Sequence, residues 1–124
     1  MKEELISKQA PGAIGPYSQG VKTGNLIFVS GQLPINATTG EMPSDIKSQT
    51  RQSIENIMSI LEEGGATLDN VVKTTVYLAD MSLFGEMNEV YSQYFKEVYP
   101  ARAAFAVKEL PKKALVEIEV IAAI

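Results

Sequence analysis

The stretch of residues 26–65, LIFVSGQLPINATTGEMPSDIKSQTRQSIENIMSILEEGG, decides the fold class because its hydrophobic period changes along the way. Leu26–Gly31 is a run of apolar and small residues that predicts a buried strand. Pro34 lacks an amide donor, so we expect this strand to end within residues 32–35. From Ile46 to Leu61, apolar residues recur at spacings of three and four, which predicts an amphipathic helix of about five turns.

Turn and cap residues divide the rest of the chain. Ser44 or Asp45 can cap the first helix, and Gly64-Gly65 supplies the left-handed residue that ends it. The opening segment is rich in Pro and Gly and predicts a loop. We further expect a strand at 19–21 in a hairpin with 26–31, strands at 71–78, 102–107 and 115–121, and a second helix from Asp80 or Ser82 to Pro100. The Tyr and Phe residues of the second helix are expected to pack in the core.

This order of elements predicts one α+β domain over residues 1–124, with a mixed sheet of about six strands and two helices on one face. Strands spaced at about 4.8 Å make a sheet roughly 25 to 30 Å wide, whereas two helices cover about 20 Å of it. The other face stays bare, and Leu26-Ile27-Phe28-Val29 is apolar on both sides. We therefore expect a homo-oligomer in which sheets pack on one another.

The composition excludes several kinds of chemistry. The chain has 124 residues with no histidine, cysteine or tryptophan, and its only arginines are Arg51 and Arg102. A zinc site, a thiol enzyme and a Ser-His-Asp triad are therefore excluded. An enzyme with this composition works with Arg, Lys, carboxylates, hydroxyls, backbone amides and water.

Charge and hydropathy indicate which partners and compartment to expect. A net charge of −4 with dispersed basic residues argues against nucleic-acid binding. No apolar run exceeds five residues, so we expect no membrane span, and the N-terminus lacks the pattern of a signal peptide. The absence of cysteine fits a reducing compartment, and we expect a cytoplasmic protein.

The last predicted strand carries two acids among apolar residues. Alternation places Glu117 and Glu119 on one face, opposite Val116, Ile118 and Val120. The glutamates either mark a solvent face or place one carboxylate in a cleft opposite a cation. Arg102, expected at the start of the neighbouring strand, is the candidate cation, because a guanidinium matches a carboxylate in two prongs where lysine does not. Its alternative role is a surface ion pair.

Two loops with glycine are further candidates for a binding site. These are residues 15–19 (GPYSQ) and 30–34 (SGQLP), in which glycine lets a backbone approach a ligand and Tyr17 can wall a pocket. The other interpretation of both loops is a tight turn at a strand end. Neither GxGxxG nor GxxxxGK[ST] occurs, so no phosphate-binding loop is predicted.

Seven short motifs together resemble one known family. They are residues 15–20 (GPYSQG), 29–34 (VSGQLP), 51–56 (RQSIEN), 72–78 (VKTTVYL), 87–91 (MNEVY), 99–102 (YPAR) and 115–119 (LVEIE). In this order and without large gaps, they resemble the YjgF-type family, also called the Rid or reactive intermediate deaminase family. The resemblance covers essentially the whole chain, and the Pro-Ala-Arg segment carries most of its functional weight.

The resemblance implies a fold, an assembly and a reaction. The fold is the chorismate-mutase-like α+β fold of the bacillar type, as a homotrimeric barrel with sheets inside, helices outside and a cleft at each subunit interface. The deaminase branch hydrolyses enamines and imines, such as 2-aminoacrylate and 2-aminocrotonate, to 2-oxo acids and ammonia. The activity implied is that of a 2-iminobutanoate/2-iminopropanoate deaminase, without cofactor or metal.

The resemblance also implies roles for particular residues. Arg102 clamps the substrate carboxylate, and Glu117 holds or activates the attacking water. Tyr17 packs against the substrate, while Ser30 and the amide of Gly31 contact it.

Two further positions of the family site correspond to Asn88 and Ala104 in this sequence. Asn88 contributes from nearby. Ala104 stands where many relatives have a cysteine, so the thiol is absent while a backbone carbonyl that orients the water is retained.

Three other functions are weighed against the deaminase. The same cleft suits a non-catalytic protein that binds small carboxylates such as 2-oxo acids. A ribonuclease or translation inhibitor, an activity attributed to some relatives, is disfavoured by the acidic charge balance. The sequence says nothing for or against a chaperone-like holdase.

Overall fold

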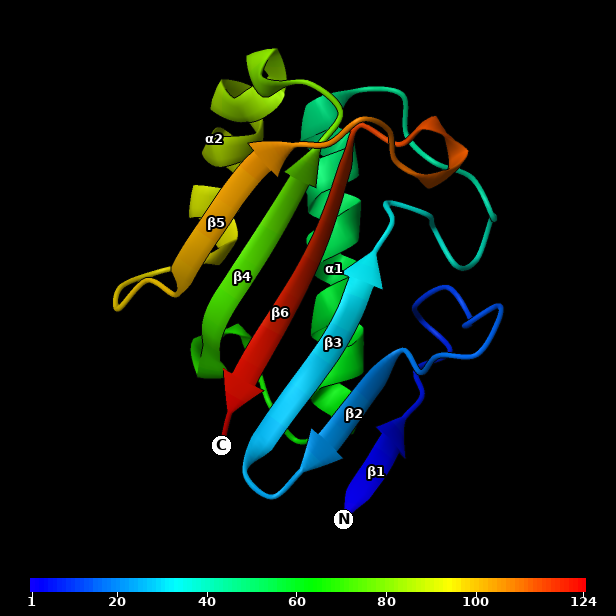
Figure 1. Cartoon of the computed structure of the whole chain (residues 1–124), viewed down its shortest axis with the longest axis vertical. Helices are drawn as coiled ribbons and strands as arrows, with labels where there is room; N and C mark the ends of the chain where they lie inside the picture. The colour runs from blue at the N-terminus through cyan, green and yellow to red at the C-terminus, as the bar shows by residue number, and fades with distance from the viewer.

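A computed structural model describes all 124 residues as one six-stranded mixed sheet with two α-helices (Figure 1). The strands run in the order β1-β2-β3-β6-β4-β5 across the sheet, and only the β4–β5 pair is parallel. The elements are β1 (Lys2–Leu5), β2 (Gly20–Thr23), β3 (Leu26–Gln32), α1 (Ile46–Glu63), β4 (Val71–Leu78), α2 (Phe84–Tyr94), β5 (Ala101–Ala106) and β6 (Val116–Ala123), with short 3-10 turns η1 (Leu68–Asn70), η2 (Met81–Leu83) and η3 (Pro111–Lys113). The predicted α+β class is confirmed.

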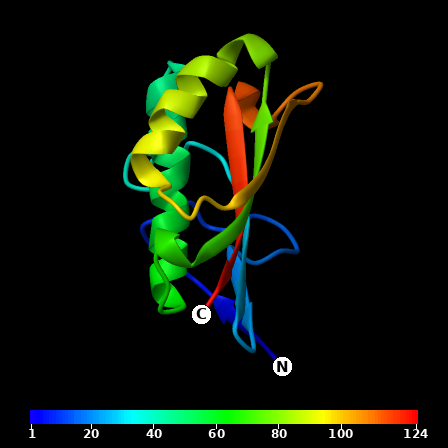
Figure 2. The same cartoon turned by 90° about the vertical axis from the view of Figure 1, so that its left-hand side faces the viewer.

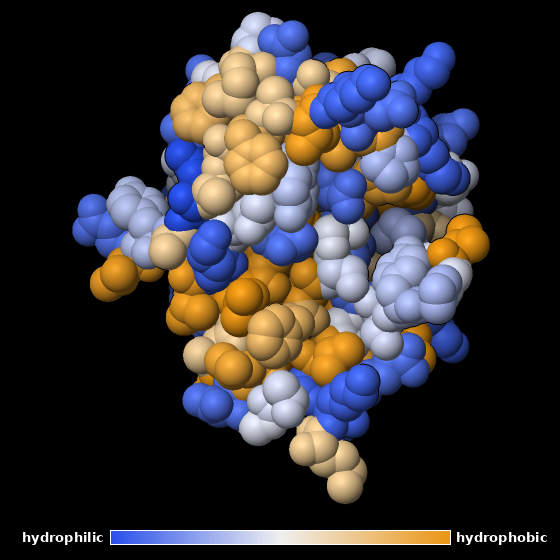
Figure 3. Space-filling model, in the orientation of Figure 1, coloured by the Kyte–Doolittle hydropathy of each residue, from blue (hydrophilic) through white to orange (hydrophobic).

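Both helices cover the same face of the sheet, as expected (Figure 2). The core lies between the two layers, where Ile54 and Ile57 of α1 and Val76 and Ile118 of the central strands are fully buried. The other face carries no helix, and we call it the open face. Phe28 and other apolar residues are exposed there, and Figure 3 shows apolar side chains gathered over the lower half of the sheet.

Helix α1 starts and ends where its cap residues predict. The Asp45 side chain accepts a hydrogen bond from the Ser48 amide at 2.9 Å, so Asp45 and not Ser44 is the cap. At the other end Gly65 has φ of +80°, the left-handed conformation that glycine adopts without strain. Neither α1 nor α2 combines the length and the apolar character that a membrane crossing requires.

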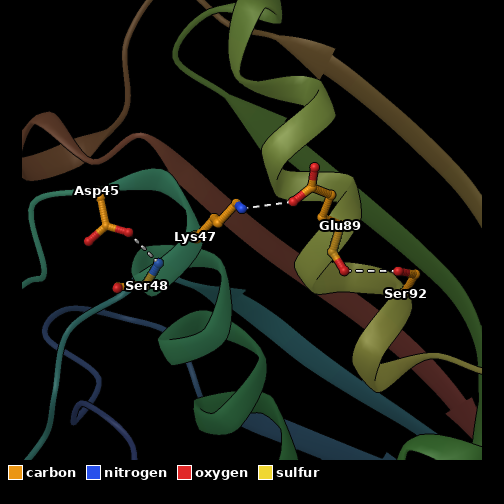
Figure 4. Close-up of polar contacts among 5 residues, drawn as sticks. All are labelled: Asp45, Lys47, Ser48, Glu89 and Ser92. Carbon is orange, nitrogen blue, oxygen red and sulfur yellow. Dashed lines mark hydrogen bonds and ion pairs between the residues drawn. The ribbon is translucent and has the colours of Figure 1, made fainter.

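The two helices are tied to each other at the surface (Figure 4). Lys47 of α1 forms an ion pair with Glu89 of α2 at 2.8 Å. The Ser92 hydroxyl donates to the Glu89 carbonyl at 2.8 Å, one turn further along α2. The ion pair thus links α2, the helix that carries Asn88, to α1.

Two expectations about elements are wrong. The opening segment is not all loop, because Lys2–Leu5 pairs with β2 as an edge strand. Its charged sequence has no strand period, so only the long-range pairing reveals it. Helix α2 ends at Tyr94 and not at Pro100, because Phe95 turns to extended backbone and buries its ring. At the start of the same region, Asp80 caps the η2 turn that leads into α2.

Candidate active site

Arg102 lies on the helix-covered face, beneath α2. It pairs in register with Thr74 of β4, whose side chain is fully buried on that face. Its Nη1 donates to Asn88 Oδ1 at 2.6 Å, and its guanidinium carbon lies 4.7 Å from the ring centre of Tyr91 and 5.3 Å from that of Phe84. A surface pocket of about 470 Å³ opens beside it, lined by Asn88, Tyr91, Ser92, Tyr99, Pro100 and Arg102.

The guanidinium of Arg102 has no acidic partner in the chain. The single ion pair of the structure joins Lys47 and Glu89, so the surface ion pair weighed for Arg102 does not form within the chain. Asn88 occupies only one of its nitrogen atoms. The remaining N–H groups are available at the pocket for a planar anion such as a carboxylate.

Glu117 lies on the open face, half-buried. It pairs in register with Tyr77, whose hydroxyl donates to Glu119 at 2.9 Å. Burial raises the pKa of the Glu117 carboxyl, and the negative charge of Glu119 adds to the increase. Glu117 is therefore a partly desolvated carboxylate with an acidic neighbour.

A bulge in β3 brings the backbone of Gly31 against Glu117. Val29 pairs with Val120 but Gln32 pairs with Ile118, so β3 carries one extra residue between these pairs. A Cβ atom at Gly31 would collide with the Glu117 carboxylate and lie 3.0 Å from its Cδ. Only glycine leaves room for the carboxylate at this position.

Helix α1 holds the strand just after the bulge. The Ser53 hydroxyl donates to the Gln32 carbonyl at 2.8 Å, and Asn56 Nδ2 donates to the Leu33 carbonyl at 3.1 Å and the Ile35 carbonyl at 3.0 Å. The bulge is therefore anchored on its C-terminal side by buried polar side chains.

Ser30 and Tyr17 belong to the same region as Gly31. The Ser30 hydroxyl donates to the Ser18 carbonyl at 2.6 Å and so holds the loop that carries the exposed Tyr17. Buried Gln19 fixes the base of this loop, accepting from the Ser7 amide at 2.7 Å and donating to the Pro11 carbonyl at 2.7 Å. The loop is a built structure and not a simple tight turn.

The expected site residues thus fall into two groups on opposite faces of the sheet. Arg102 and Asn88 lie on the helix-covered side, while Glu117 contacts Gly31 on the open face. The expectation that the strand of Arg102 neighbours the last strand is wrong, because β4 lies between β5 and β6. Within one chain the two groups do not meet.

Ala104 contributes its backbone at the edge of the sheet. Its side chain packs against the core, on the same face as Arg102. The Val107 amide donates to the Leu78 carbonyl, so the backbone groups of Val107 point toward β4. Along β5 the backbone groups of successive residues point alternately toward β4 and away from it. The N–H and C=O groups of Arg102 and Ala104 therefore point away from β4, at an edge with no further strand.

Two aromatic residues of this site were assigned by the sequence to core packing alone. Tyr91 is buried as expected, yet its ring also lies under the guanidinium of Arg102, together with Phe84. The signal was their spacing, because Phe84, Asn88 and Tyr91 are four and three residues apart and share one helix face. No three acidic side chains come close enough together to bind a metal ion.

Comparisons with known proteins agree with this architecture. The family model described as Endoribonuclease L-PSP matches residues 7–124. The 2-iminobutanoate/2-iminopropanoate deaminase of Escherichia coli K12 is 44% identical over 125 residues, covering 98% of each chain. A RutC family protein of Pyrococcus abyssi is 57% identical over 122 residues, covering 98% of this chain and 96% of the relative.

Solved structures give the same result. The crystal structure of E. coli TdcF with bound serine superposes with a TM-score of 0.95 at 42% identity, covering 98% of each chain. The fold and the pocket define a small α+β protein with an unpaired guanidinium, that of Arg102, at its surface. The chain belongs to the YjgF/Rid family, which the Endoribonuclease L-PSP model describes.

Proposed function

We propose that this protein is an enamine/imine deaminase that hydrolyses 2-imino acids, and their enamine tautomers such as 2-aminoacrylate and 2-aminocrotonate, to 2-oxo acids and ammonia. The observation that carries the proposal is the guanidinium of Arg102, which lies in a surface pocket, is held by Asn88 and has no acidic partner in the chain. The 44% identity to the E. coli deaminase supports the same reaction.

The proposed reaction needs a clamp, a held water and one proton acceptor. Arg102 binds the substrate carboxylate in two prongs and so fixes the C2 atom. Water adds to C2 of the protonated imine as one of its protons passes to Glu117, which then returns that proton to the amine nitrogen. The C–N bond breaks, ammonia leaves with the hydroxyl proton as ammonium, and the C2 oxygen becomes the carbonyl of the 2-oxo acid.

The raised pKa of Glu117 suits this role. A carboxylate that is partly desolvated is a better proton acceptor than one in water. The same carboxylate lies against the backbone of Gly31. Tyr17 and Ser30, from the adjacent loop, shape this side of the site.

The site requires two chains, because Arg102 and Glu117 lie on opposite faces of the sheet in one chain. The apolar open face and the unpaired outer edge of β5 both favour packing against other copies. A homotrimer with the site at each subunit interface, combining Arg102 and Ala104 of one chain with Glu117 of the next, accommodates both groups.

The proposal is tested by following imino acids released by an amino-acid oxidase. The protein should accelerate their loss, and Arg102→Ala should lower kcat/KM about 10²-fold or more, because the clamp is lost. Arg51→Ala, the other arginine, is the matched control and should keep the activity of the unaltered protein. Equal turnover in Arg102→Ala would overturn the assignment.

A carboxylate-binding role without catalysis is the second candidate. It is favoured by the Arg102 pocket itself and by the serine bound in the related TdcF structure. Calorimetry with 2-oxobutanoate separates the two functions. Tight binding that depends on Arg102, with no hydrolysis of any imino acid in the assay above, would establish the binding protein in place of the enzyme.

A further inference from the structure

Arg102 is held in place although it lies near the start of an edge strand and is exposed. An unsupported arginine side chain samples many rotamers, and binding a ligand then costs conformational entropy. Here the Tyr91 ring covers the guanidinium at 4.7 Å, the Phe84 ring lies at 5.3 Å, and Asn88 accepts from Nη1 at 2.6 Å. All three residues come from one face of α2.

Tyr91 is itself fixed more firmly than packing alone requires. Its side chain is 6% exposed, and its ring lies 4.4 Å from that of Phe95. Its hydroxyl lies 2.8 Å from Oγ1 of Thr74, a residue with no exposed surface. Thr74 pairs in register with Arg102, so contacts run from β4 through α2 and back to β5 beside the same guanidinium.

We infer that Tyr91, anchored by Thr74, is a positioning residue that holds the Arg102 guanidinium ready for a carboxylate. The ring occupies a face of the guanidinium, and Asn88 takes one nitrogen, so the other nitrogen atoms stay in the plane in which a carboxylate binds. Preorganisation of this kind raises affinity by lowering the entropy lost on binding. The inference rests on the proposed function for its substrate, but the carboxylate binding can be measured without turnover.

The test uses Tyr91→Leu, which removes the ring, and Tyr91→Phe, which keeps the ring and loses the hydroxyl. Tyr91→Leu should raise the Kd for 2-oxobutanoate and the KM for the imino acid about five- to tenfold, with kcat nearly unchanged. Tyr91→Phe and Thr74→Val should each raise the Kd less than about threefold. Tyr94→Leu is the control, because its hydroxyl contacts Glu55 on α1 and not Arg102.

A double-mutant cycle separates positioning from general destabilisation. In the Arg102→Ala background, Tyr91→Leu should leave the Kd for 2-oxobutanoate unchanged, since the ring acts only through the guanidinium. An equal loss of affinity in both backgrounds would overturn the inference, as would an unchanged Kd in Tyr91→Leu itself. If Tyr91→Leu does not fold, Phe84→Leu replaces the other ring in the same cycle, with a smaller effect of the same pattern expected and the same outcomes against it.

The outcomes for the two proposals are distinct. If Tyr91→Leu lowers the affinity for 2-oxobutanoate only when Arg102 is present, and the protein hydrolyses no imino acid, the positioning role is supported and the deaminase is contradicted. Hydrolysis that depends on Arg102 but is indifferent to the Tyr91 ring supports the deaminase and contradicts the positioning role.

Discussion

Gly31 decides how closely Glu117 approaches the backbone of β3. Because a Cβ at this position would collide with the carboxylate, Gly31→Ala should push the Glu117 side chain aside. A displacement of about 1 Å at a reacting group can cost up to about 10²-fold in rate, so we expect kcat to fall about 10- to 100-fold. Steady-state kinetics and thermal unfolding check this, with folding little affected. Gly12→Ala, where the added Cβ meets nothing, is the control, and an unchanged kcat in Gly31→Ala would show that Glu117 is not needed at this position.

Glu117 is expected to affect both activity and stability. Its pKa is raised in the folded protein, so the folded state prefers the protonated form, and the stabilisation present below the ordinary value of 4.5 is lost as pH rises through the folded-state pKa. Glu117→Gln should therefore abolish hydrolysis yet raise the free energy of unfolding at pH 7. The two proteins should converge in stability below pH 4.5, where both side chains are neutral.

The rate of the unaltered protein should follow the same group. Since Glu117 accepts a proton in the proposed reaction, kcat/KM should fall on the acid side at a higher pH than for an ordinary glutamate. Glu119→Gln removes the second cause of the raised pKa, so its acid limb should move to lower pH. Urea unfolding measures the stability of Glu117→Gln, and a pH–rate profile measures the acid limb of kcat/KM. An acid limb that is the same in the unaltered protein, in Glu117→Gln and in Glu119→Gln would rule out Glu117 as the acceptor.

At the scale of elements, the loop between β1 and β2 depends on one side chain. Gln19 is buried and bonds the backbone of Ser7, Ala10 and Pro11. Gln19→Ala would leave these buried groups without partners, and we expect a loss of about 2 to 4 kcal/mol in the free energy of unfolding. Urea denaturation measures the loss. Gln9→Ala, an exposed position in the same loop, should change stability little, and equal effects of the two substitutions would contradict the role of Gln19.

The elements predicted best from sequence are those whose signals are local. Helix α1 has a clear period, a cap at Asp45 and a left-handed Gly65, so both of its ends were found. Strand β1 has no local signal, since Lys2–Leu5 becomes a strand only by pairing with β2. The end of α2 depends on burial of Phe95, a tertiary contact that ends the helix well before Pro100.

The candidate site was likewise predicted where its signals are local and missed where they depend on tertiary structure. Sequence motifs identified Arg102, Asn88 and Glu117 as candidate site residues, and Arg102 contacts Asn88 in the structure. Which face each occupies depends on strand register, and the position of β4 between β5 and β6 could not be read from the sequence. The double use of Tyr91 for core and site was missed because a buried aromatic residue is usually explained by packing alone.

At the scale of the whole molecule, a single chain holds two incomplete halves of the proposed site. The Arg102 half has a cation without an acid, and the Glu117 half has an acid without a cation. The sheet separates them, and the bare surfaces, the open face and the outer edge of β5, adjoin one half each. The proposal of a second copy therefore rests on chemistry as well as on the uncovered apolar surface.

Subunit complementation tests this division of the site directly. Arg102→Ala and Glu117→Gln chains should each be inactive alone, since every site then lacks one group. When the two are unfolded together and refolded at equal amounts, about a quarter of the sites should combine an intact Arg102 from one chain with an intact Glu117 from another and regain activity. Sites built within one chain would regain none. A mixture of Arg102→Ala with Arg102→Ala/Glu117→Gln is the control and should stay inactive, and a 1:1 mixture of the two single variants that stays inactive although mass spectrometry detects mixed oligomers would contradict a site shared between chains.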